Sequence, residues 1–452
     1  MLVSLKIKNF LSFDSEEGAC LDVRTKNCRG KSNHYIKSNK VNLLRFASIY
    51  GANAAGKSNI VSSFEFFKDV VLQNQNKNFW QKYYTKYNRN CKDNVSKPTV
   101  AEICIKLGTK LYRYGFEIML NKSIIVKEWL FQDDTLIFIR DIEKENYQIN
   151  LDLFKLTDVR NMVEALFNVS KSENKTLFIS EMNRAKRSLY KCENEKNLII
   201  YQEVFNWIRD SLVIVRPDQP PRIISNAINP NGDTKAVIRI LGQFGFDIES
   251  LDFVEIPIDS VFSDIGMPDD LKKDFIDDIS QQLSEEDDGG FSIAINGPTG
   301  LHFFAKENDK PIVKRLSIVH KNKSSFKVTE ESDGTKRLLE LIEILINNDK
   351  EITYIVDEID RSLHPKLTKA FIELFLESEN LGNTQLLVTT HASILLDQKL
   401  LRKDSICFAT KVGGNTIIKN LADIPNVRSE LDLEEAYFSG RFEALPNINK
   451  YL

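Results

Sequence analysis

Cysteine is scarce in this sequence and shows no metal-binding pattern. The 452 residues include six cysteines, spread over the whole length without a C-x-x-C pair. Structural zinc sites need closely spaced cysteine and histidine ligands. The spacing therefore excludes a cysteine metal site. We expect reduced and mostly buried thiols at Cys20, Cys28, Cys91, Cys104, Cys192 and Cys407.

Long apolar runs and a strong net charge are also missing. No run approaches the ~20 residues that span a bilayer. The first ten residues alternate apolar and cationic side chains as a strand does and lack the apolar stretch of a signal peptide. The 61 basic and 64 acidic residues nearly cancel, leaving a net charge of −3, so no global field attracts nucleic acid. These absences predict a soluble, cytoplasmic protein without a membrane span.

The residues that are present change in character along the chain. Residues 1–151 carry mainly strand periodicity, interrupted by one helix, and residues 152–290 contain long helical segments. Residues 291–452 alternate helices with buried strands, which predicts a parallel sheet. We therefore predict an α/β fold in which residues 1–151 and 291–452 form one head, and residues 152–290 form a helical insertion used for assembly.

Residues 51–58, GANAAGKS, complete the phosphate-loop pattern G-x-x-x-x-G-K-[ST]. A predicted strand over 45–50 precedes them and an apolar-striped helix follows, as this motif requires. Glycines let backbone N–H groups close around phosphates, Lys57 reaches the β- and γ-phosphates, and the Ser58 hydroxyl ligates Mg²⁺. A chance glycine turn is the alternative. The predicted nucleotide-binding residues of the loop are Gly51, Asn53, Gly56, Lys57, Ser58 and Asn59.

A second, acidic element follows a buried strand about 300 residues later. Asp357 is predicted to hold Mg²⁺ and Glu358 to polarise the attacking water, which makes the chain an ATPase that forms ADP and phosphate. The alternative is a solvated acidic turn. The long separation excludes compact small GTPases and disfavours hexameric AAA+ modules.

Residues 331–337, ESDGTKR, resemble the ABC signature, normally written LSGGQ, and lie just before a predicted helix. Ser332, Gly334 and Thr335 would form an anion site at the helix N-terminus, which in ABC proteins serves the γ-phosphate held by the opposite subunit. This interpretation requires a dimer. The alternative is a plain helix cap by Ser332 or Asp333.

Two further segments favour the same class of ATPase. Residues 359–365, IDRSLHP, resemble the D-loop of SMC-related ATPases. His391 follows a buried strand and is predicted to contact the γ-phosphate as the switch histidine does.

The remaining polar candidates are interpreted without a catalytic role. The histidines at positions 34, 302 and 320 are interpreted as surface or packing residues, and the acids at 274, 277 and 278 as the solvent face of a helix. Gln132 and Gln219 are candidates for the Mg²⁺-sensing glutamine, but neither context supports the role, which stays unassigned.

Together these segments resemble stand-alone ABC-type ATPases related to RecF and SMC heads, which occur in bacterial abortive-infection and anti-phage systems, including the ATPase subunit of PARIS. The segments that carry this resemblance are residues 7–13, 50–59, 331–339, 355–365, 389–393 and 437–446. The resemblance implies ATP and Mg²⁺ as cofactors, slow turnover, and a homodimer or higher even-numbered homo-oligomer. It also implies a separate nuclease or toxin chain and a phage-derived trigger, with the protein as sensor and scaffold. The alternative is a RecF/SMC-like DNA-repair ATPase, and DNA binding is left open.

Overall fold

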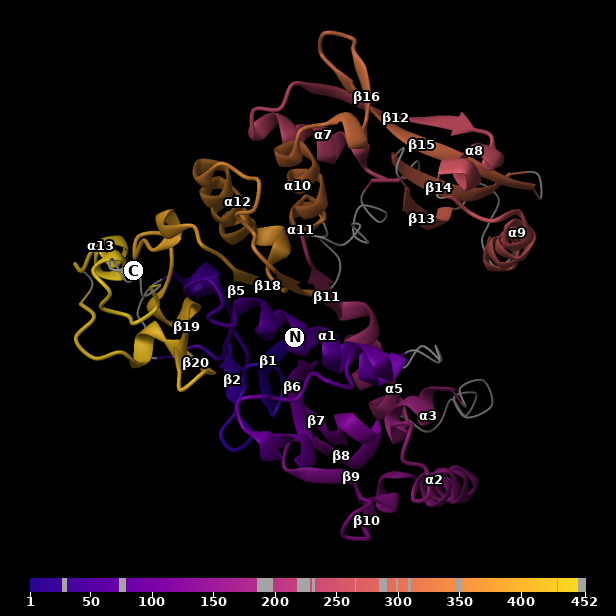
Figure 1. Ribbon diagram of the computed structural model, residues 1–452, viewed down its shortest axis with the longest axis vertical. Helices are drawn as coiled ribbons and strands as arrows, with labels where there is room; N and C mark the ends of the chain where they lie inside the picture. Colours follow the sequence, from indigo (N-terminus) through magenta and orange to yellow (C-terminus); the bar gives the residue numbers. More distant parts are fainter. Residues whose placement is uncertain are drawn as a thin grey trace. The chain divides into compact units, whose positions relative to one another are not determined.

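The computed structural model places most of the chain, and Figure 1 traces it from end to end. The described residues are 1–26, 31–72, 79–184, 198–217, 228–229, 232–264, 266–283, 291–297, 300–307, 310–346, 351–428 and 430–445. Within them, no helix has both the length and the apolar character needed to cross a membrane. The predicted fold class is confirmed: an α/β P-loop fold with a β-rich N-terminal lobe, a mainly parallel C-terminal sheet and an inserted unit.

The chain divides into two compact units, each made of separate segments. Unit 1 comprises Met1–Val215, Lys350–Ile359 and Gly382–Leu452, and unit 2 comprises Arg216–Asp349 and Asp360–Leu381. These limits differ from the predicted insertion at 152–290. Residues 152–215 belong to unit 1, whereas the signature segment belongs to unit 2. Residues 284–290, at the predicted end of the insertion, lie outside the described residues.

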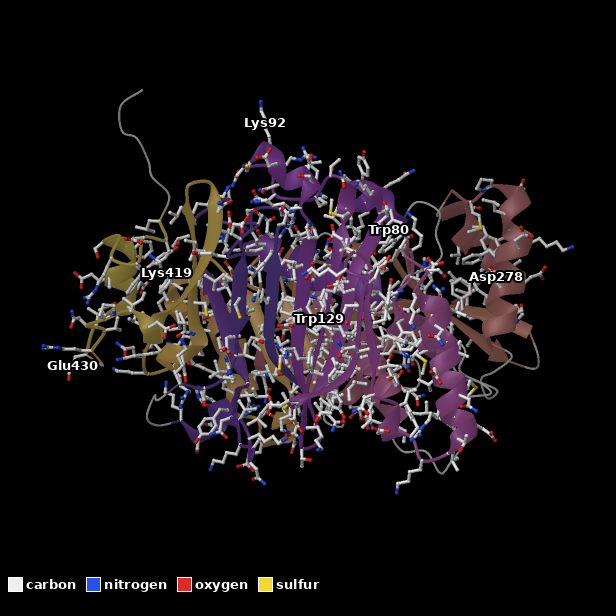
Figure 2. The ribbon with its side chains drawn as sticks, turned by 90° about the horizontal axis from the view of Figure 1, so that it is seen from below. Trp80, Lys92, Trp129, Asp278, Lys419 and Glu430 are labelled. Carbon is white, nitrogen blue, oxygen red and sulfur yellow. The ribbon has the colours of Figure 1, made fainter. Side chains whose placement is uncertain are left out.

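The first layer of unit 1 is a seven-stranded antiparallel sheet in the order β10-β9-β8-β7-β6-β1-β2. Its strands are β1 (Leu2–Lys8), β2 (Ala19–Asp22), β6 (Thr99–Leu107), β7 (Lys110–Met119), β8 (Ile124–Gln132), β9 (Thr135–Asp141) and β10 (Asn146–Ile149). Burial alternates along β6, so one face of the sheet packs into the core and the other carries polar side chains. Trp129 of β8, labelled in Figure 2, donates its indole N–H to Glu102 on β6.

The second layer of unit 1 is a six-stranded sheet in the order β11-β17-β18-β5-β19-β20, parallel except for its last pair. Its strands are β5 (Phe46–Tyr50), β11 (Leu212–Val215), β17 (Thr353–Val356), β18 (Gln385–Thr389), β19 (Ile406–Val412) and β20 (Asn415–Asn420). Every residue of β5, β17 and β18 is buried, as expected for parallel strands covered on both faces. The Gln385 amide joins the two sheets, since it bonds both the N–H and the C=O of Leu2.

The helices of unit 1 pack between and beside these sheets. They are α1 (Lys57–Leu72), α2 (Thr157–Ser170), α3 (Phe178–Arg184), α5 (Ile199–Asn206), which continues as a π-turn over Trp207–Ser211, and α13 (Leu433–Phe438). The stripe of α1 that includes Ile60, Phe64 and Phe67 lies in the main core. Unit 1 also contains the two-stranded pair β3 (Tyr35–Ile36) and β4 (Leu43–Leu44).

A buried ion pair explains why residues 152–184 pack with unit 1. The Arg140 guanidinium on β9 donates to the backbone carbonyls of Ser170 and Thr176, and to Glu128 on β8 at 2.9 Å. Glu128 in turn accepts the backbone N–H groups of Phe178 and Ile179 at the start of α3. Local helical periodicity could not show this attachment, because the sheet residues that make it are distant in sequence.

Unit 2 contains a five-stranded antiparallel sheet as well as helices (Figure 1). Its strands are β12 (Ile248–Ile256), β13 (Phe291–Gly297), β14 (Gly300–Glu307), β15 (Lys310–His320) and β16 (Ser325–Lys327). Its helices are α7 (Thr234–Gln243), α8 (Ile258–Asp264), α9 (Asp269–Leu283), α10 (Asp333–Leu341), α11 (Glu343–Ile346) and α12 (Pro365–Glu377). The central strand β15 pairs with β12, β14 and β16. Residues 328–330 form a 3-10 turn between β16 and α10.

Candidate functional site

The phosphate loop lies between β5 and α1, as the sequence predicts. Lys57 begins α1, is buried, and donates from Nζ to the carbonyl oxygens of Gly51 and Ala52 at 2.8 and 3.1 Å. The positively charged Lys57 ammonium group therefore lies within the loop that would surround a phosphate. Ala54 and Gly56 have φ values of 61° and 105°, so the loop bends through the left-handed region at both positions.

Polar side chains from other segments of the chain form hydrogen bonds that support the phosphate loop. A Cβ on Gly56 would lie 2.1 Å from Thr416 Oγ1, so glycine is required there by contact as well as by φ. The Thr416 hydroxyl donates to the Ala55 carbonyl at 2.8 Å and lies 2.7 Å from Ser12 Oγ. Asn59 donates its amide to the same Ser12 hydroxyl at 2.7 Å, so in this structure its side chain supports the loop.

Ser12 and Thr416 could not be identified from the sequence as site residues, because they contact the loop from 47 and 361 residues away along the chain. The hydrogen bond between them joins positions 404 residues apart. The one signal in the sequence is that Ser12 falls in segment 7–13, which carries the family resemblance but suggests no role for this residue. Asn53, by contrast, is exposed on the loop as a ligand contact would need.

The acidic residues that follow β17 lie next to the phosphate loop. Asp357 directly follows β17, is 4% exposed, and accepts hydrogen bonds on Oδ1 from Ser58 Oγ at 3.3 Å and from Thr389 Oγ1 at 2.6 Å. The strands β5, β17 and β18 are parallel neighbours, so the residues at their carboxyl ends meet at one edge of the sheet. The structure therefore brings Ser58 and Asp357 together across 299 residues of sequence.

Thr389 holds the acidic turn in place through hydrogen bonds that the sequence does not reveal. Its hydroxyl donates to Asp357 and accepts the backbone N–H of Glu358 at 2.8 Å, and its carbonyl accepts the N–H of Ile359 at 3.1 Å. Glu358 is half-buried and has a φ of 48°, an uncommon value for a residue with a side chain. Thr389 therefore fixes the turn that presents both acids.

His391 lies two residues beyond β18 and is exposed. The backbone on both sides of it is tied to β5: the Thr390 N–H donates to the Ile49 carbonyl at 3.2 Å, and the Tyr50 hydroxyl donates to the Ala392 carbonyl at 3.3 Å. An exposed imidazole on an anchored segment at this sheet edge is suitably placed to contact a ligand.

The signature residues belong to unit 2, separately from the residues above. The Ser332 hydroxyl caps α10, accepts the backbone N–H of Thr335 at 3.1 Å and lies 2.8 Å from the Thr335 hydroxyl. The helix-cap alternative thus describes the geometry present, and Thr335 is buried. A Cβ on Gly334 would lie 3.2 Å from the Ser362 carbonyl, so the signature packs closely on the D-loop segment.

The oxygen atoms of Ser58 and Asp357 at the sheet edge are suitable ligands for a magnesium ion. Mg²⁺ prefers hydroxyl, carboxylate, phosphate and water oxygens, and a nucleotide site supplies one or two protein ligands beside the phosphates. Ser58 and Asp357 offer one hydroxyl and one carboxylate oxygen 3.3 Å apart. Among the residues placed in the structure, no group of three or more His, Cys, Asp and Glu that could hold a metal ion is found.

The other predicted polar residues have varied surroundings. The histidines at 34 and 302 are buried, whereas His320 bonds Glu331, a contact that the sequence analysis did not anticipate. The acids of α9 at 274, 277 and 278 face solvent, and Figure 2 labels Asp278. Gln132 lies in β8 and accepts from the Tyr112 hydroxyl at 3.4 Å, and Gln219 lies outside the described residues.

The expectation of mostly buried thiols is wrong for the cysteines that are described. Cys20 and Cys91 are exposed, Cys104 is intermediate, and Cys407 alone of these four is buried. Cys20 and Cys104 lie on the polar face of the seven-stranded sheet, where strand alternation turns them outward. The cysteines at 28 and 192 lie outside the described residues.

Comparison with known proteins gives one family and several distant structures. The family described as "AAA domain, putative AbiEii toxin, Type IV TA system" matches residues 46–397, from the start of β5 to beyond His391. No curated protein matches the chain.

Three solved structures of SMC heads are similar to the chain at low identity. An SMC head bound to the C-terminal winged-helix domain of ScpA is 15% identical with a TM-score of 0.42, covering 96% of this chain and 99% of that one. The Smc head of Pyrococcus furiosus, bound to the C-terminal domain of ScpA, is 13% identical with a TM-score of 0.39, covering 98% and 99%. The SMC head of Thermotoga maritima is 13% identical with a TM-score of 0.33, covering 93% and 98%.

Proposed function

The chain belongs to this AAA-domain family of ATPases, and we propose that it binds ATP with Mg²⁺ and hydrolyses it slowly at a site shared by two copies. The observation that carries the proposal is the meeting of the phosphate loop with the acidic strand end, where the Ser58 hydroxyl reaches Asp357. A hydroxyl and a buried carboxylate beside a complete phosphate loop are the combination that nucleotide hydrolysis needs.

The residues of unit 1 would share the chemistry as follows. Lys57 and the loop N–H groups would bind the phosphates, and Ser58 with Asp357 would hold Mg²⁺, which supplies positive charge to the phosphate oxygens when bound. Glu358 would orient and polarise the attacking water, with its backbone held by Thr389. His391 would contact the γ-phosphate from the neighbouring strand end.

The signature of a second copy would complete the site. Ser332, Gly334 and the N-terminal end of α10 carry hydroxyl and backbone groups suited to an anion, and they belong to a different unit from the phosphate loop. We therefore propose a homodimer, or an even-numbered assembly of dimers, in which each phosphate loop faces the signature of the other copy.

The cellular role that we propose is that of sensor and scaffold in an abortive-infection system, controlling a separate nuclease or toxin chain. Support comes from the family description, which names a toxin of a toxin-antitoxin system, and from the sequence resemblance to anti-phage ATPases. A phage-derived molecule would be the trigger that changes the nucleotide-bound state.

The first test is the mass in solution of the wild type and of Glu358→Gln, each with and without ATP and Mg²⁺. We expect Glu358→Gln to lose hydrolysis by about 100-fold or more while forming a dimer, or a multiple of dimers, that persists with ATP. Adding duplex DNA to the hydrolysis assay tests the repair alternative, which predicts stimulation that falls steeply with salt. Monomers that bind ATP without pairing would overturn the shared-site proposal.

The second test concerns the cellular role. Cells carrying this gene together with its neighbouring genes are challenged with phage, and plaque counts are compared between the wild type and Lys57→Ala. We expect protection only with the wild type, because Lys57→Ala removes the phosphate-binding cation. Equal plaque counts for both, with every phage tested, would contradict the defence role and leave the ATPase assignment standing.

A further inference from the structure

The segment leading into the signature contains a buried acid where the ABC pattern has leucine. Glu331 occupies the first position of that pattern, and its side chain is only 7% exposed. A buried carboxylate is costly unless a donor satisfies it, and removing that donor costs more than removing both groups. This chain therefore needs a partner for Glu331 that a leucine would not need.

His320 is that partner. Its Nε2 donates to Glu331 Oε1 at 2.7 Å, and the imidazole, 26% exposed, lies edge-on to the Phe326 ring at a centroid distance of 5.4 Å. His320 is the last residue of β15, and Phe326 belongs to the paired strand β16. The donor is thus part of the five-stranded sheet.

The sheet and the signature are also continuous along the chain. From β16, the 3-10 turn Val328–Glu330 leads to Glu331, whose N–H donates to the Val328 carbonyl at 3.3 Å, and then to Ser332, the cap of α10. The hydrogen bond between His320 and Glu331 ties the end of this segment back to β15. The segment is therefore attached to the sheet at both of its ends. Movement of the β15 to β16 hairpin would therefore be transmitted to Ser332.

We propose that His320 is a positioning residue: by bonding Glu331 it holds Ser332 and the start of α10 in place for the nucleotide of a second copy. The five-stranded sheet of unit 2 thereby controls ATP-driven pairing of two copies. The proposal rests on the shared site proposed above and adds the contact by which unit 2 would regulate it.

The test compares variants made in the Glu358→Gln background, with the dissociation constant of the ATP-bound dimer as the main readout. Ser317→Ala is the matched control, because Ser317 bonds Ser325 between the same two strands at 2.6 Å without touching the signature segment. We expect His320→Ala to weaken pairing by roughly 10- to 100-fold, since it strands a buried carboxylate, while Ser317→Ala changes it by less than about threefold.

Two variants separate positioning from general damage. His320→Gln retains a side-chain N–H donor and should restore most of the pairing, and the double variant His320→Leu with Glu331→Leu should pair better than His320→Ala because no polar group is left unpaired. ATP affinity of separate protomers should stay at the parent value in every variant, since the phosphate loop belongs to unit 1. If His320→Ala fails to fold, these two variants carry the test.

The outcomes are distinguishable. If the His320 variants and Ser317→Ala have equal dimer dissociation constants, the positioning role of His320 is overturned and the proposed function is left intact. Loss of protomer ATP affinity together with pairing also overturns it, because the effect would then be general. Failure of the Glu358→Gln parent to pair with ATP overturns the shared site and this role with it.

Discussion

Two of the buried carboxylates of unit 1 have surroundings that differ in kind. Glu128, in the antiparallel sheet, is fully buried and is bonded by the Arg140 guanidinium, the Tyr114 hydroxyl at 3.0 Å and two backbone N–H groups. Asp357, at the edge of the parallel sheet, is bonded by the hydroxyls of Thr389 and Ser58. The first acid has its counter-charge within the fold, and the second lies against hydroxyls at the mouth of a phosphate loop.

A buried acid can therefore serve the fold or a bound ligand, depending on its hydrogen-bond partners. An acid that bonds an arginine and several backbone groups of neighbouring segments fastens those segments together, as Glu128 fastens the start of α3 to the sheet. An acid whose hydroxyl partner Ser58 is itself exposed can still exchange that partner for a ligand. We therefore propose that Glu128 contributes to stability and Asp357 to chemistry, and the following predictions test that contrast.

The largest effect on stability is expected from removing the buried ion pair between Arg140 and Glu128. Arg140→Met leaves Glu128 buried without its cation, so we expect the free energy of unfolding to fall by about 3–5 kcal/mol in chemical denaturation. The control Arg24→Met removes an exposed pair with Asp22 and should cost less than about 1 kcal/mol. A drop in the ATPase rate of folded Arg140→Met, without loss of stability, would reverse our assignment of this acid.

A smaller effect is expected from removing the hydroxyl at the functional acid. Thr389→Val keeps the side-chain shape but deletes the bonds to Asp357 and Glu358, so we expect about 1–3 kcal/mol lower stability and roughly tenfold slower hydrolysis. Thr353→Val is the control, because it deletes a buried bond to Gln385 in the same sheet away from the site. Equal ATPase rates for these two variants would show that Thr389 does not position the acids.

The smallest effect concerns a buried base in the same unit. Burial, together with the nearby cations Lys31, Arg402 and Arg45, lowers the pKa of His34 to about 4 from an ordinary value of 6.5. Between these values the unfolded chain binds a proton that the folded chain does not, so stability should fall as pH drops from 6.5 towards 4. Denaturation at pH 7 and pH 5 should show a smaller pH-dependent loss in His34→Gln. Identical pH dependence in both proteins would contradict the assignment to His34.

Sequence patterns were most informative where the signal is local. The phosphate loop was predicted because its strand, loop and helix follow one another within residues 46–72, and the acidic strand end because Asp357 directly follows a short apolar strand. The hydrogen bonds that Thr389, Ser12 and Thr416 make could not be predicted, since they depend on which segments become neighbours in the folded chain. Thr389 bonds Asp357 from the adjacent strand, and Ser12 bonds Thr416 across 404 residues. Strand β12 was missed because it lies among helical segments.

The predicted limits of the insertion differ from those of the units for the same reason. Helical periodicity shows that residues 157–170 form a helix and does not show which sheet the helix packs against. The Glu128 and Arg140 contacts decide that, and they depend on strands β8 and β9. The signature similarly falls into unit 2 because its preceding turn continues from the five-stranded sheet.

The position of β5 has a consequence for the synthesis of the chain. Its neighbours in the sheet are β18 and β19, which follow it by more than 330 residues. A ribosome therefore releases the phosphate loop long before the strands that flank it exist, and contacts of such sequence separation form slowly. A nascent chain, or one cut short before Gln385, cannot complete the sheet that holds the loop, so nucleotide binding would begin only after β18 and β19 have been synthesised.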